Sequence, residues 1–527
     1  MLVSIFNDVI GPVMRGPSSS HCSAALRIGR LARDLMDGDF ADVLVEFDRN
    51  GSLPTTHESQ GSDMGLFGGL MGWEAADARL PGSPEALRES GVRIAIETVD
   101  AGDPHPNTYR LTLRSDREVH TMRAISTGGG MMEVIDLDGF EVSLGGDCFE
   151  TLLFAASAAE DIVAALKEKF EAASVTVHEG SRGVLVSVKG DGFVPDSILA
   201  AISGIDSVKR LNPVLPVLSK GDTRVPFGTC EEMLKFDDGR GTPLWRLGCL
   251  YEMQRGGLTE DEVLAKMVEI VRIVRESISS GIKGTEYDDR ILGHQCGRFN
   301  EMMSSGGLLD GGALNRIILY VTALMEVKSS MGVIVAAPTA GACAALPGAV
   351  VAMAESMELD EIAMAKALLA SGMIGVFIAT RWTFAAEVGG CQAEGGAAAS
   401  MAGAALVTLA GGSLSQSIAA SSMAFQSMIG LICDPVANRV EVPCLGKNVM
   451  AASNALSCAN MALAGYDPVI PLDEVIETAK QVAAQMPREL RCTNLGGLSV
   501  TPTAVSLEER LASQRAAACG TGCGCVG

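Results

Sequence analysis

Two long stretches without a charged residue constrain most strongly what this chain can fold into. They run from Ser329 to Ala354 and from Gly395 to Cys433. Each is long enough to cross a bilayer as a helix. The second stretch, however, is built from Ala, Gly, Ser and Gln, with few of the Leu, Ile and Phe residues that drive insertion into lipid. We therefore expect buried helices that pack closely through small residues, with a polytopic membrane protein as the alternative.

The rest of the composition is typical of a large, acidic, ordered protein. The chain has 527 residues and a formal net charge of -23. Its length suggests about three or four domains. A chain this acidic repels nucleic acid and anionic membrane surfaces, so neither is expected as a partner. Charged residues make up only 20% and 60 residues are glycine, which indicates an apolar, small-residue-rich protein rather than a disordered one.

The role expected of the 14 cysteines depends on the compartment of the protein. The opening residues, MLVSIFNDVIGPVMRG, lack the cationic segment and apolar run of a secretory signal, so we expect a cytoplasmic location. Thiols in a reducing compartment are more often metal ligands, reactive groups or buried hydrophobes than disulfides. Four of them are expected to be ordinary buried side chains: Cys148, Cys249, Cys343 and Cys458.

Hydrophobic patterning divides the chain into three units. Residues 1–140 mix short β-rich runs with helical runs and Gly-rich turns, which predicts an α+β domain. Residues 141–220 show alternating apolar positions in the order βαββαβ of a ferredoxin-like unit. Residues 212–243 are rich in proline and form the best linker candidate. Nearly everything in 221–527 beyond that linker is helical in pattern, which predicts an all-α catalytic or binding domain.

Three cysteines stand beside residues that end or begin regular structure. They are Cys391 in GGCQAE, Cys433 in LICDPV and Cys444 in VEVPCLG. The sequence has no CxxC pair, so zinc-ribbon and ferredoxin-type spacings are absent. Three thiolates on a [4Fe-4S] cluster would leave one iron open to bind a substrate oxygen as a Lewis acid. Buried structural thiols are the alternative interpretation.

Several longer motifs, taken in chain order, resemble a known enzyme family. They are GPVMRGPSSSHCSAALRIGR (11–30), HPNT (105–108) with STGGG (126–130), VIVAAPTAG (333–341), GGCQAEGGAAASMA (389–402), CDPVANRVEVPC (433–444) and GGLSVTPT (496–503). With them the chain resembles the iron-sulfur-dependent L-serine dehydratases over nearly its whole length. The resemblance implies a domain related to the family's β part, an ACT-like unit in 141–220 and a helical α part, fused in one chain.

The resemblance also implies a cofactor and a reaction. By it, Cys391, Cys433 and Cys444 hold a [4Fe-4S] cluster. The family removes water from L-serine, and the resulting aminoacrylate hydrolyses to pyruvate and ammonium. The expected ligand is thus a small amino acid.

Polar residues inside these motifs are candidates for holding that substrate. The candidates are Ser18, Ser19, Ser20, His21, Asn107 and Thr339. The three serines precede an apolar-periodic run, so they can lie at a helix N-terminus, where backbone N-H groups bind anions. A plain N-cap is the alternative for the serines, and packing, capping or turn formation is the alternative for the other three.

The chain departs from the family pattern where a base should take the weakly acidic α-proton. Family members commonly carry a GHGTD-like segment, whereas this chain has SQGSD at 59–63, with Gln60 in the place of the histidine. An amide is not a base. His57 lies three residues earlier and is a substitute candidate, with an exposed loop histidine as the alternative. Residues Thr383 to Ala386 and Cys492 also differ, where a Ser-Gly pair and a Glu are usual.

These departures leave two alternatives to an L-serine dehydratase open. One is a related [4Fe-4S] lyase acting on another small β-hydroxy or β-thiol amino acid. The other is a non-catalytic amino-acid-binding relative.

The C-terminal segment AAACGTGCGCVG carries Cys519, Cys523 and Cys525 in a Gly-rich end. Some single-chain relatives have a C-terminal cysteine that reaches the cluster as a removable fourth ligand. One of these three is a candidate for that role, and a tail of oxidation-prone thiols is the alternative. A homodimer is the expected assembly of such an apolar, weakly charged chain.

Overall fold

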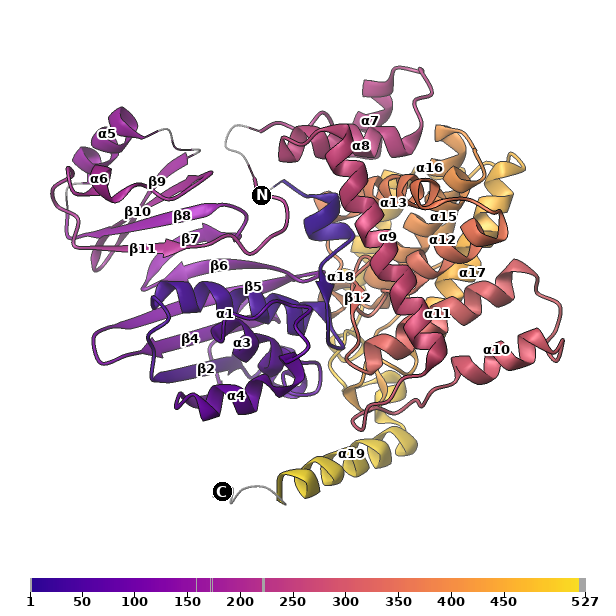
Figure 1. Cartoon of the computed structure of the whole chain (residues 1–527), viewed down its shortest axis with the longest axis horizontal. Helices are drawn as coiled ribbons and strands as arrows, with labels where there is room; N and C mark the ends of the chain where they lie inside the picture. The colour runs from indigo at the N-terminus through magenta and orange to yellow at the C-terminus, as the bar shows by residue number, and fades with distance from the viewer. Residues whose placement is uncertain (1, 158, 171, 173, 220–222, 521–527) are drawn as a thin grey trace.

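The computed structural model describes residues 2–157, 159–170, 172, 174–219 and 223–520. Figure 1 shows a sheet-containing part beside a larger helical part. The N-terminal segment joins the two. Its π-helical turn, Ile5–Val9, lies against α13 of the helical part, and β1 (Val13–Met14) pairs with β12 (Ile334–Val335). The first residues of the chain therefore belong to the packing of the helical part.

A six-stranded sheet forms the first unit. Its strands are β2 (Asp42–Asp48), β3 (Arg93–Val99), β4 (Thr108–Arg114), β5 (Val119–Gly128), β6 (Met131–Leu137) and β7 (Phe140–Leu144). They lie in the order β3-β2-β4-β5-β6-β7, with β2 and β3 parallel and the other pairs antiparallel. The accompanying helices are α1 (Ala24–Leu35), α2 (Leu53–Thr56), α3 (Ser62–Leu70) and α4 (Ser83–Glu89). Buried and half-buried residues alternate along β5, as expected for an α+β domain with one covered sheet face.

Helices α1 and α3 touch through glycine. A Cβ at Gly65 would lie 1.9 Å from the carbonyl oxygen of Cys22, and one at Gly69 would lie 2.1 Å from that of Leu26. No side chain fits at either position, so the two helices approach at backbone distance. This contact brings the segment that precedes α1, with Ser18 and His21, beside the loop that precedes α3, with Gln60.

The second unit has its own sheet and core. Its elements are β8 (Phe149–Ala155), α5 (Ala159–Lys169), β9 (Ser174–Gly180), β10 (Gly183–Gly190), α6 (Asp196–Leu199) and β11 (Ser207–Leu211). The strands are antiparallel, in the order β11-β8-β10-β9. The βαββαβ order expected from the alternating valines is therefore present. Leu153, Ile162 and Val186 lie in a hydrophobic core separate from that of the larger sheet.

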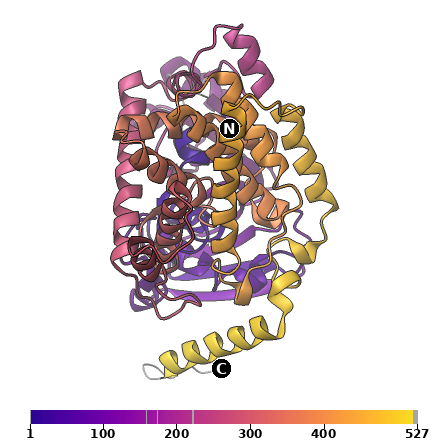
Figure 2. The same ribbon diagram turned by 90° about the vertical axis from the view of Figure 1, so that its right-hand side faces the viewer.

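The helical part follows. Its helices are α7 (Cys230–Asp237), α8 (Leu244–Gly256), α9 (Glu260–Lys283), α10 (Cys296–Ser304), α11 (Ala313–Ser329), α12 (Ala345–Ser356), α13 (Glu361–Arg381), α14 (Ala386–Gly389), α15 (Ala397–Leu409), α16 (Leu414–Gln426), α17 (Cys444–Leu463), α18 (Leu472–Gln485) and α19 (Pro502–Gly520). In both views α19 projects away from the rest of this part (Figures 1 and 2).

Two details differ from the sequence-based expectation. The two-residue strand β12 interrupts the expected all-α part, because the N-terminal segment supplies a partner for it. The proline-rich segment 212–243, expected to be a linker, contains α7. Thr229 and Glu232 form a capping box there, which starts a helix in a segment with little hydrophobic periodicity.

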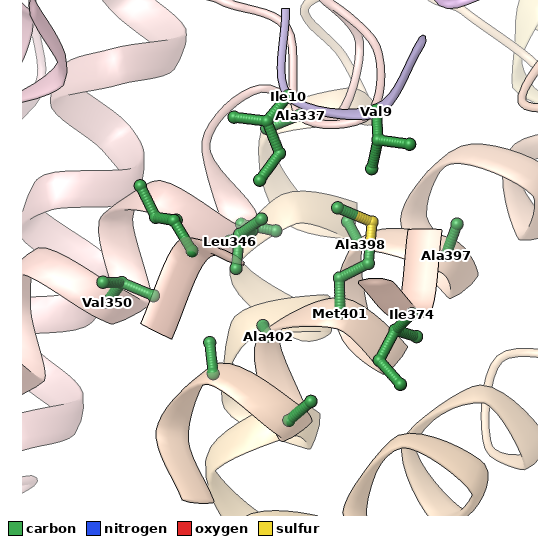
Figure 3. Packing of buried hydrophobic residues seen from close by; sticks show 14 of the residues in the cluster. Val9, Ile10, Ala337, Leu346, Val350, Ile374, Ala397, Ala398, Met401 and Ala402 are labelled. Carbon is green, nitrogen blue, oxygen red and sulfur yellow. The ribbon is translucent and has the colours of Figure 1, made fainter. Parts of the chain in front are cut away.

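The uncharged stretches are buried, as the small-residue composition predicts. Helix α15 is buried along nearly all its length and lies against α12, α13, α16 and α17. Figure 3 shows Ala397, Ala398 and Ala402 of α15 close to Ile374 and Leu346, where larger side chains would not fit. Within the described residues, α13 is the one helix long and apolar enough to cross a membrane, and 78% of its apolar window is buried inside the protein.

The cysteines expected to be ordinary are ordinary. Cys148, Cys249, Cys343 and Cys458 are buried free thiols.

Candidate metal centre

Three buried cysteines from distant segments gather in the helical part. Cys391 follows α14, Cys433 follows α16 and Cys492 follows α18. Backbone hydrogen bonds hold the last two segments together: the N-H of Cys433 donates to the carbonyl of Leu490 (2.9 Å), and the N-H of Cys492 donates to the carbonyl of Cys433 (3.1 Å). The Sγ atoms of Cys391 and Cys433 and a carboxylate oxygen of Glu394 lie within 4.8 Å of one another. These atoms form a compact set of metal-type donors.

Cys444, the first residue of α17, borders the same group. It is not among the three residues whose ligand atoms lie within 4.8 Å of one another. Burial raises the pKa of its thiol, and the neighbouring charges of Cys391 and Glu394 raise it further. The structure thus brings Cys391 and Cys433 together with Cys444 beside them, and it adds Cys492.

A lysine compensates the charge that these thiols would carry as thiolates. The Nζ of Lys447 donates to Cys391 Sγ (3.8 Å), to Asp434 Oδ1 (2.8 Å) and to the carbonyl of Ile432 (2.7 Å). Burial opposes the charge of Lys447, but Cys391 and Asp434 outweigh it and raise the pKa of the ammonium. The thiols of Cys391 and Cys492, followed by burial, raise the pKa of Cys433. A fixed cation at this place favours thiolates when a metal binds.

Glu394 is the carboxyl group that contacts these thiols. Its Oε1 accepts from the hydroxyl of Thr339 (2.7 Å), and its Oε2 accepts from the thiol of Cys391 (3.9 Å). Burial raises the pKa of Glu394 to about 7. A carboxyl group with this pKa can both take and release a proton near neutral pH.

The sheet part contributes a buried histidine. His21 Nδ1 lies 3.0 Å from Ser18 Oγ and 3.4 Å from Glu387 Oε1, and its Nε2 lies 2.8 Å from Thr56 Oγ1. Burial lowers the pKa of His21 to about 3. The ring is therefore neutral at physiological pH and serves as a hydrogen-bonding group rather than a cation.

The serines beside His21 connect the two parts of the molecule. Ser18 stands before the π-helical turn Ser19–Ser23 without a side-chain capping bond, so it is not the plain N-cap considered from the sequence. Ser19 Oγ accepts from the N-H of Ala340 (3.1 Å), in the loop that carries Thr339. Ser20 is buried next to them.

Two buried polar groups lack partners close to this site. Asn107 Nδ2 and Glu387 Oε2 have no hydrogen bond of normal geometry among the described residues, although the two side chains are close enough for Asn107 to oppose the rise that burial causes in the pKa of Glu387. The hydroxyl of Ser52 donates to Asn107 Oδ1, and a cavity of about 390 Å³ is lined by Ser52, Glu387 and Arg491, among others. Unsatisfied donors and acceptors beside a cavity of this size are typical of a site for a small polar ligand.

Gln60 and His57, the two positions considered for a base, differ in surroundings. Gln60 is 1% exposed, and its Nε2 donates to Asn438 Oδ1 (3.1 Å) and to Cys492 Sγ (3.6 Å). His57 Nδ1 lies 2.8 Å from an oxygen of Asp63, and the ring lines a different cavity of about 170 Å³. Burial opposes the charge of His57, but Asp63 outweighs it and raises its pKa. Position 60 therefore faces the thiols, and His57 faces Asp63.

The candidate tail ligands cannot be placed. The side chain of Cys519 and the residues Cys523 and Cys525 lie outside the described part of the chain.

Glu394, Lys447 and Glu387 were not predicted as site residues from the sequence, although the spacing of the first two from a candidate cysteine indicates such a role. Glu394 follows Cys391 by three residues and Lys447 follows Cys444 by three, a spacing that places side chains on one face of a helical turn. Glu387 has no such signal. Cys492 was noticed only as a departure from a familiar motif.

Comparison with known proteins identifies the family. Residues 155–499 match the serine dehydratase alpha chain family. The chain belongs to this family. It is 28% identical to the L-serine dehydratase of Streptomyces coelicolor, an alignment that covers 95% of this chain and 99% of that protein.

Two further relatives are separate chains. The probable L-serine dehydratase alpha chain of Bacillus subtilis is 36% identical over 49% of this chain and 87% of its own length. The probable beta chain of the same organism is 38% identical over 27% of this chain and 64% of its own length. This member of the serine dehydratase family therefore fuses parts related to both chains, and it is an enzyme of the lyase class.

Proposed function

We propose that the protein converts L-serine to pyruvate and ammonium, with a [4Fe-4S] cluster held by Cys391, Cys433 and Cys444. The observation that carries the proposal is the convergence of Cys391, Cys433 and Glu394 within 4.8 Å, in a chain of the serine dehydratase family. Loss of water gives an aminoacrylate, which tautomerises to an imine, and hydrolysis of the imine releases the products.

The residues present suit such a cluster. Thiolates are the ligands that iron-sulfur clusters use, and Cys391, Cys433 and Cys444 provide three of them from two loops and a helix start. Lys447 offsets part of their negative charge. When bound, the cluster supplies an iron that acts as a Lewis acid toward the departing hydroxyl.

Side chains of this chain bind and orient the substrate. The cavity beside Glu387 is also lined by Arg488 and Arg491, whose guanidinium groups are suited to a substrate carboxylate. The Asn107 amide, buried beside Glu387, can donate to the same substrate, and Nδ1 of the neutral His21 lies 3.4 Å from Glu387 Oε1.

We assign removal of the α-proton to Glu394. It is the carboxyl group that lies among the thiols, hydrogen-bonded to Thr339. His57 is a weaker candidate because Asp63 occupies its Nδ1. Gln60 faces the site but has no basic atom.

Anaerobic reconstitution with iron and sulfide tests the proposal. Four irons per chain, with pyruvate formed from L-serine, are expected, and Cys458→Ser serves as a control because that buried thiol lies apart from the site. L-threonine and L-cysteine are tested beside L-serine, which distinguishes the related lyase. Full iron occupancy without product from any of the three amino acids would remove the lyase function, and failure to retain iron would remove the cluster.

A non-catalytic amino-acid-binding protein is the second candidate. It is favoured by one observation, that a glutamine occupies the buried position facing Cys492. Calorimetric binding of L-serine without turnover, not rescued by Gln60→His, would support it.

We also propose that the βαββαβ unit of 149–211 is ACT-like, since it has its own sheet and core. We propose further that the protein is cytoplasmic, since the described cysteines are free thiols.

A further inference from the structure

A second group of metal-type side chains lies where the end of α9, the start of α10 and the last turn of α11 meet. It consists of His294, Cys296 and Glu326, whose ligand atoms lie within 4.8 Å of one another. Cys296 Sγ is 3.2 Å from His294 Nε2. Both atoms also lie near the carbonyl oxygen of Gly281, at 3.1 Å and 3.0 Å. One nitrogen, one sulfur and two oxygen atoms thus converge.

Glu326 is held with one oxygen engaged and the other unpartnered. The residue is 4% exposed. Its Oε1 accepts from the N-H groups of Gln295 (2.7 Å) and Cys296 (3.1 Å). Its Oε2 has no hydrogen-bond partner among the described residues, and it lies 3.9 Å from His294 Nε2. A buried carboxylate oxygen without a partner is costly, so this arrangement needs an explanation.

Close packing of α9 on α11 builds the site. A Cβ at Gly281 would lie 2.5 Å from the carbonyl oxygen of Ala323, so only glycine permits the contact. Gly281 lies in the last turn of α9, which ends at Lys283. Carbonyl groups in that turn lack an intrahelical donor and carry partial negative charge. The carbonyl is therefore available to a cation beside Glu326.

Hydrogen bonds alone do not satisfy this group. The single thiol proton of Cys296 can be donated to the carbonyl of Gly281 or to the carboxylate of Glu326, so one of these acceptors is left without it, and Glu326 Oε2 has no hydrogen bond of normal geometry among the described residues. We propose that His294, Cys296 and Glu326 bind one divalent metal ion of the zinc class, with the Gly281 carbonyl as the fourth donor. Binding forms the metal bonds to nitrogen, sulfur and oxygen and releases the thiol proton to water, without a redox change.

The donor distances suit a tetrahedral ion. Zinc bonds of about 2.0–2.3 Å require donor atoms about 3.3–3.7 Å apart, and the observed separations of 3.0, 3.1, 3.2 and 3.9 Å bracket that range. The side chain of His294 is 29% exposed, which gives an ion access from solvent. The thiolate and the carboxylate together balance its charge.

The ion has a structural role. Residues 284–295 connect α9 to α10, and the ion fixes the end of this connection against α9 and α11. Glu441 anchors the same segment by accepting from the N-H groups of Ile291 and Leu292 (2.8 Å for the shortest bond). Glu441 precedes Cys444 by three residues, so the same segment also contacts the chain just before Cys444. The proposal does not depend on the function proposed above.

Metal content of matched full-length chains tests the site. The parent is the chain with Cys519, Cys523 and Cys525 changed to serine, which removes competing tail thiols. It is compared with the same chain carrying His294→Ala or Cys296→Ser, and the controls carry His178→Ala or Cys458→Ser. Each chain is stripped with a chelator under anaerobic conditions and titrated with Zn²⁺ and with Co²⁺. Only differences between chains are interpreted, so the outcome does not depend on what Cys391 and Cys433 bind.

The parent and both controls are expected to bind one more equivalent of metal ion per chain than the His294 and Cys296 variants. In those two variants the affinity for this additional ion should be at least about 100-fold lower than in the parent. The zinc absorption edge of the extra equivalent should show one sulfur with nitrogen and oxygen neighbours. Equal binding by all chains would overturn the proposal, and so would an extra equivalent surrounded by sulfur alone.

A second variant keeps the test decisive if loss of Cys296 unfolds the chain. Glu326→Gln retains an oxygen that can accept from Gln295 and Cys296 but loses the anionic Oε2. Zn²⁺ should raise the unfolding temperature of the parent and raise that of this variant much less. An equal rise in both chains would contradict the assignment of Oε2 as a ligand.

Discussion

The two parts of the molecule supply different chemistry to the candidate metal centre. The helical part supplies ionisable groups, namely Cys391, Cys433, Glu394 and Lys447, and they contact one another directly. The sheet part supplies neutral polar groups, of which Gln60 reaches the thiol of Cys492. Under the proposed function, metal binding and proton transfer belong to the helical part, which also supplies Arg488 and Arg491 for the substrate carboxylate, and the sheet part adds neutral groups that help to orient the substrate. Changes at the cysteines of the helical part should therefore affect metal content, and changes at the polar groups of the sheet part should affect activity with the metal retained.

The largest effect is expected at Cys433. Its thiol contacts both Cys391 and Cys492, so Cys433→Ser removes the central thiol of the group. Iron content after reconstitution should fall to background, and kcat/KM for L-serine should fall at least about 1,000-fold, which corresponds to about 4 kcal/mol of transition-state stabilisation. Iron analysis and a pyruvate assay measure the two quantities.

The matching change in the sheet part is Asn107→Ala. It removes a buried amide whose oxygen accepts from Ser52, a residue that lines the cavity, without touching a thiol. Iron content should stay at the level of the unchanged chain while KM for L-serine rises. Loss of iron in this variant, or retention of iron in Cys433→Ser, would contradict the division between the two parts.

The second effect, in order of size, is expected at Glu394. Glu394→Gln keeps an acceptor for the hydroxyl of Thr339 but removes the group that takes a proton. Loss of a general base costs about 100- to 10,000-fold, so kcat should fall by that factor with iron retained. Thr339→Val, which removes this hydrogen bond and the one that the hydroxyl accepts from the N-H of Ala342 (3.1 Å), is the control and should lose about tenfold or less. If Glu394→Gln loses its iron, Glu394 is a metal ligand and the base lies elsewhere.

A smaller effect is expected at Gln60. Gln60→His places a ring where the amide now donates to Asn438 and Cys492. Because Glu394 carries the proton step, kcat should change by less than about tenfold, the size of one or two neutral hydrogen bonds. Gln60→Met, similar in shape but without donors, is the comparison. A 100-fold rise in kcat specific to Gln60→His would place the base at position 60 and would exclude Glu394 from that role.

Local patterns were sufficient to predict much of the fold. Alternation of Val184, Val186 and Val188 predicts a strand, and the small-residue composition of Gly395 to Cys433 predicts buried helices; both are present in the structure. Helix α7 was not expected because a capping box, rather than hydrophobic periodicity, starts it.

The candidate site could be predicted only where a motif carries it. Cys391 and Cys433 stand in motifs with turn residues, but Cys492 reaches them through backbone pairing between 433 and 490–492, for which no local pattern exists. The approach of Gln60 similarly depends on a backbone contact at Gly65, between α3 and the turn that precedes α1. Contacts of this kind depend on the path of the whole chain and leave no periodic signal.

The smallest effect is expected at Asp63, in the sheet part, and it depends on pH. Asp63 raises the pKa of His57 in the folded protein. A raised histidine pKa stabilises the fold at pH values below the unfolded pKa of about 6.5, and this contribution is lost as the pH rises through the folded pKa. Asp63→Asn should therefore lower the free energy of unfolding by about 1 kcal/mol more at low pH than at high pH.

Denaturant unfolding at about one pH unit below the unfolded pKa and about two units above it measures the difference. Asp100→Asn, which removes an exposed pair with Arg49, should show no such dependence because neither partner titrates in this window. Equal losses for Asp63→Asn at both pH values would mean that His57 is neutral throughout, and His57 would then again be a candidate to accept the substrate proton.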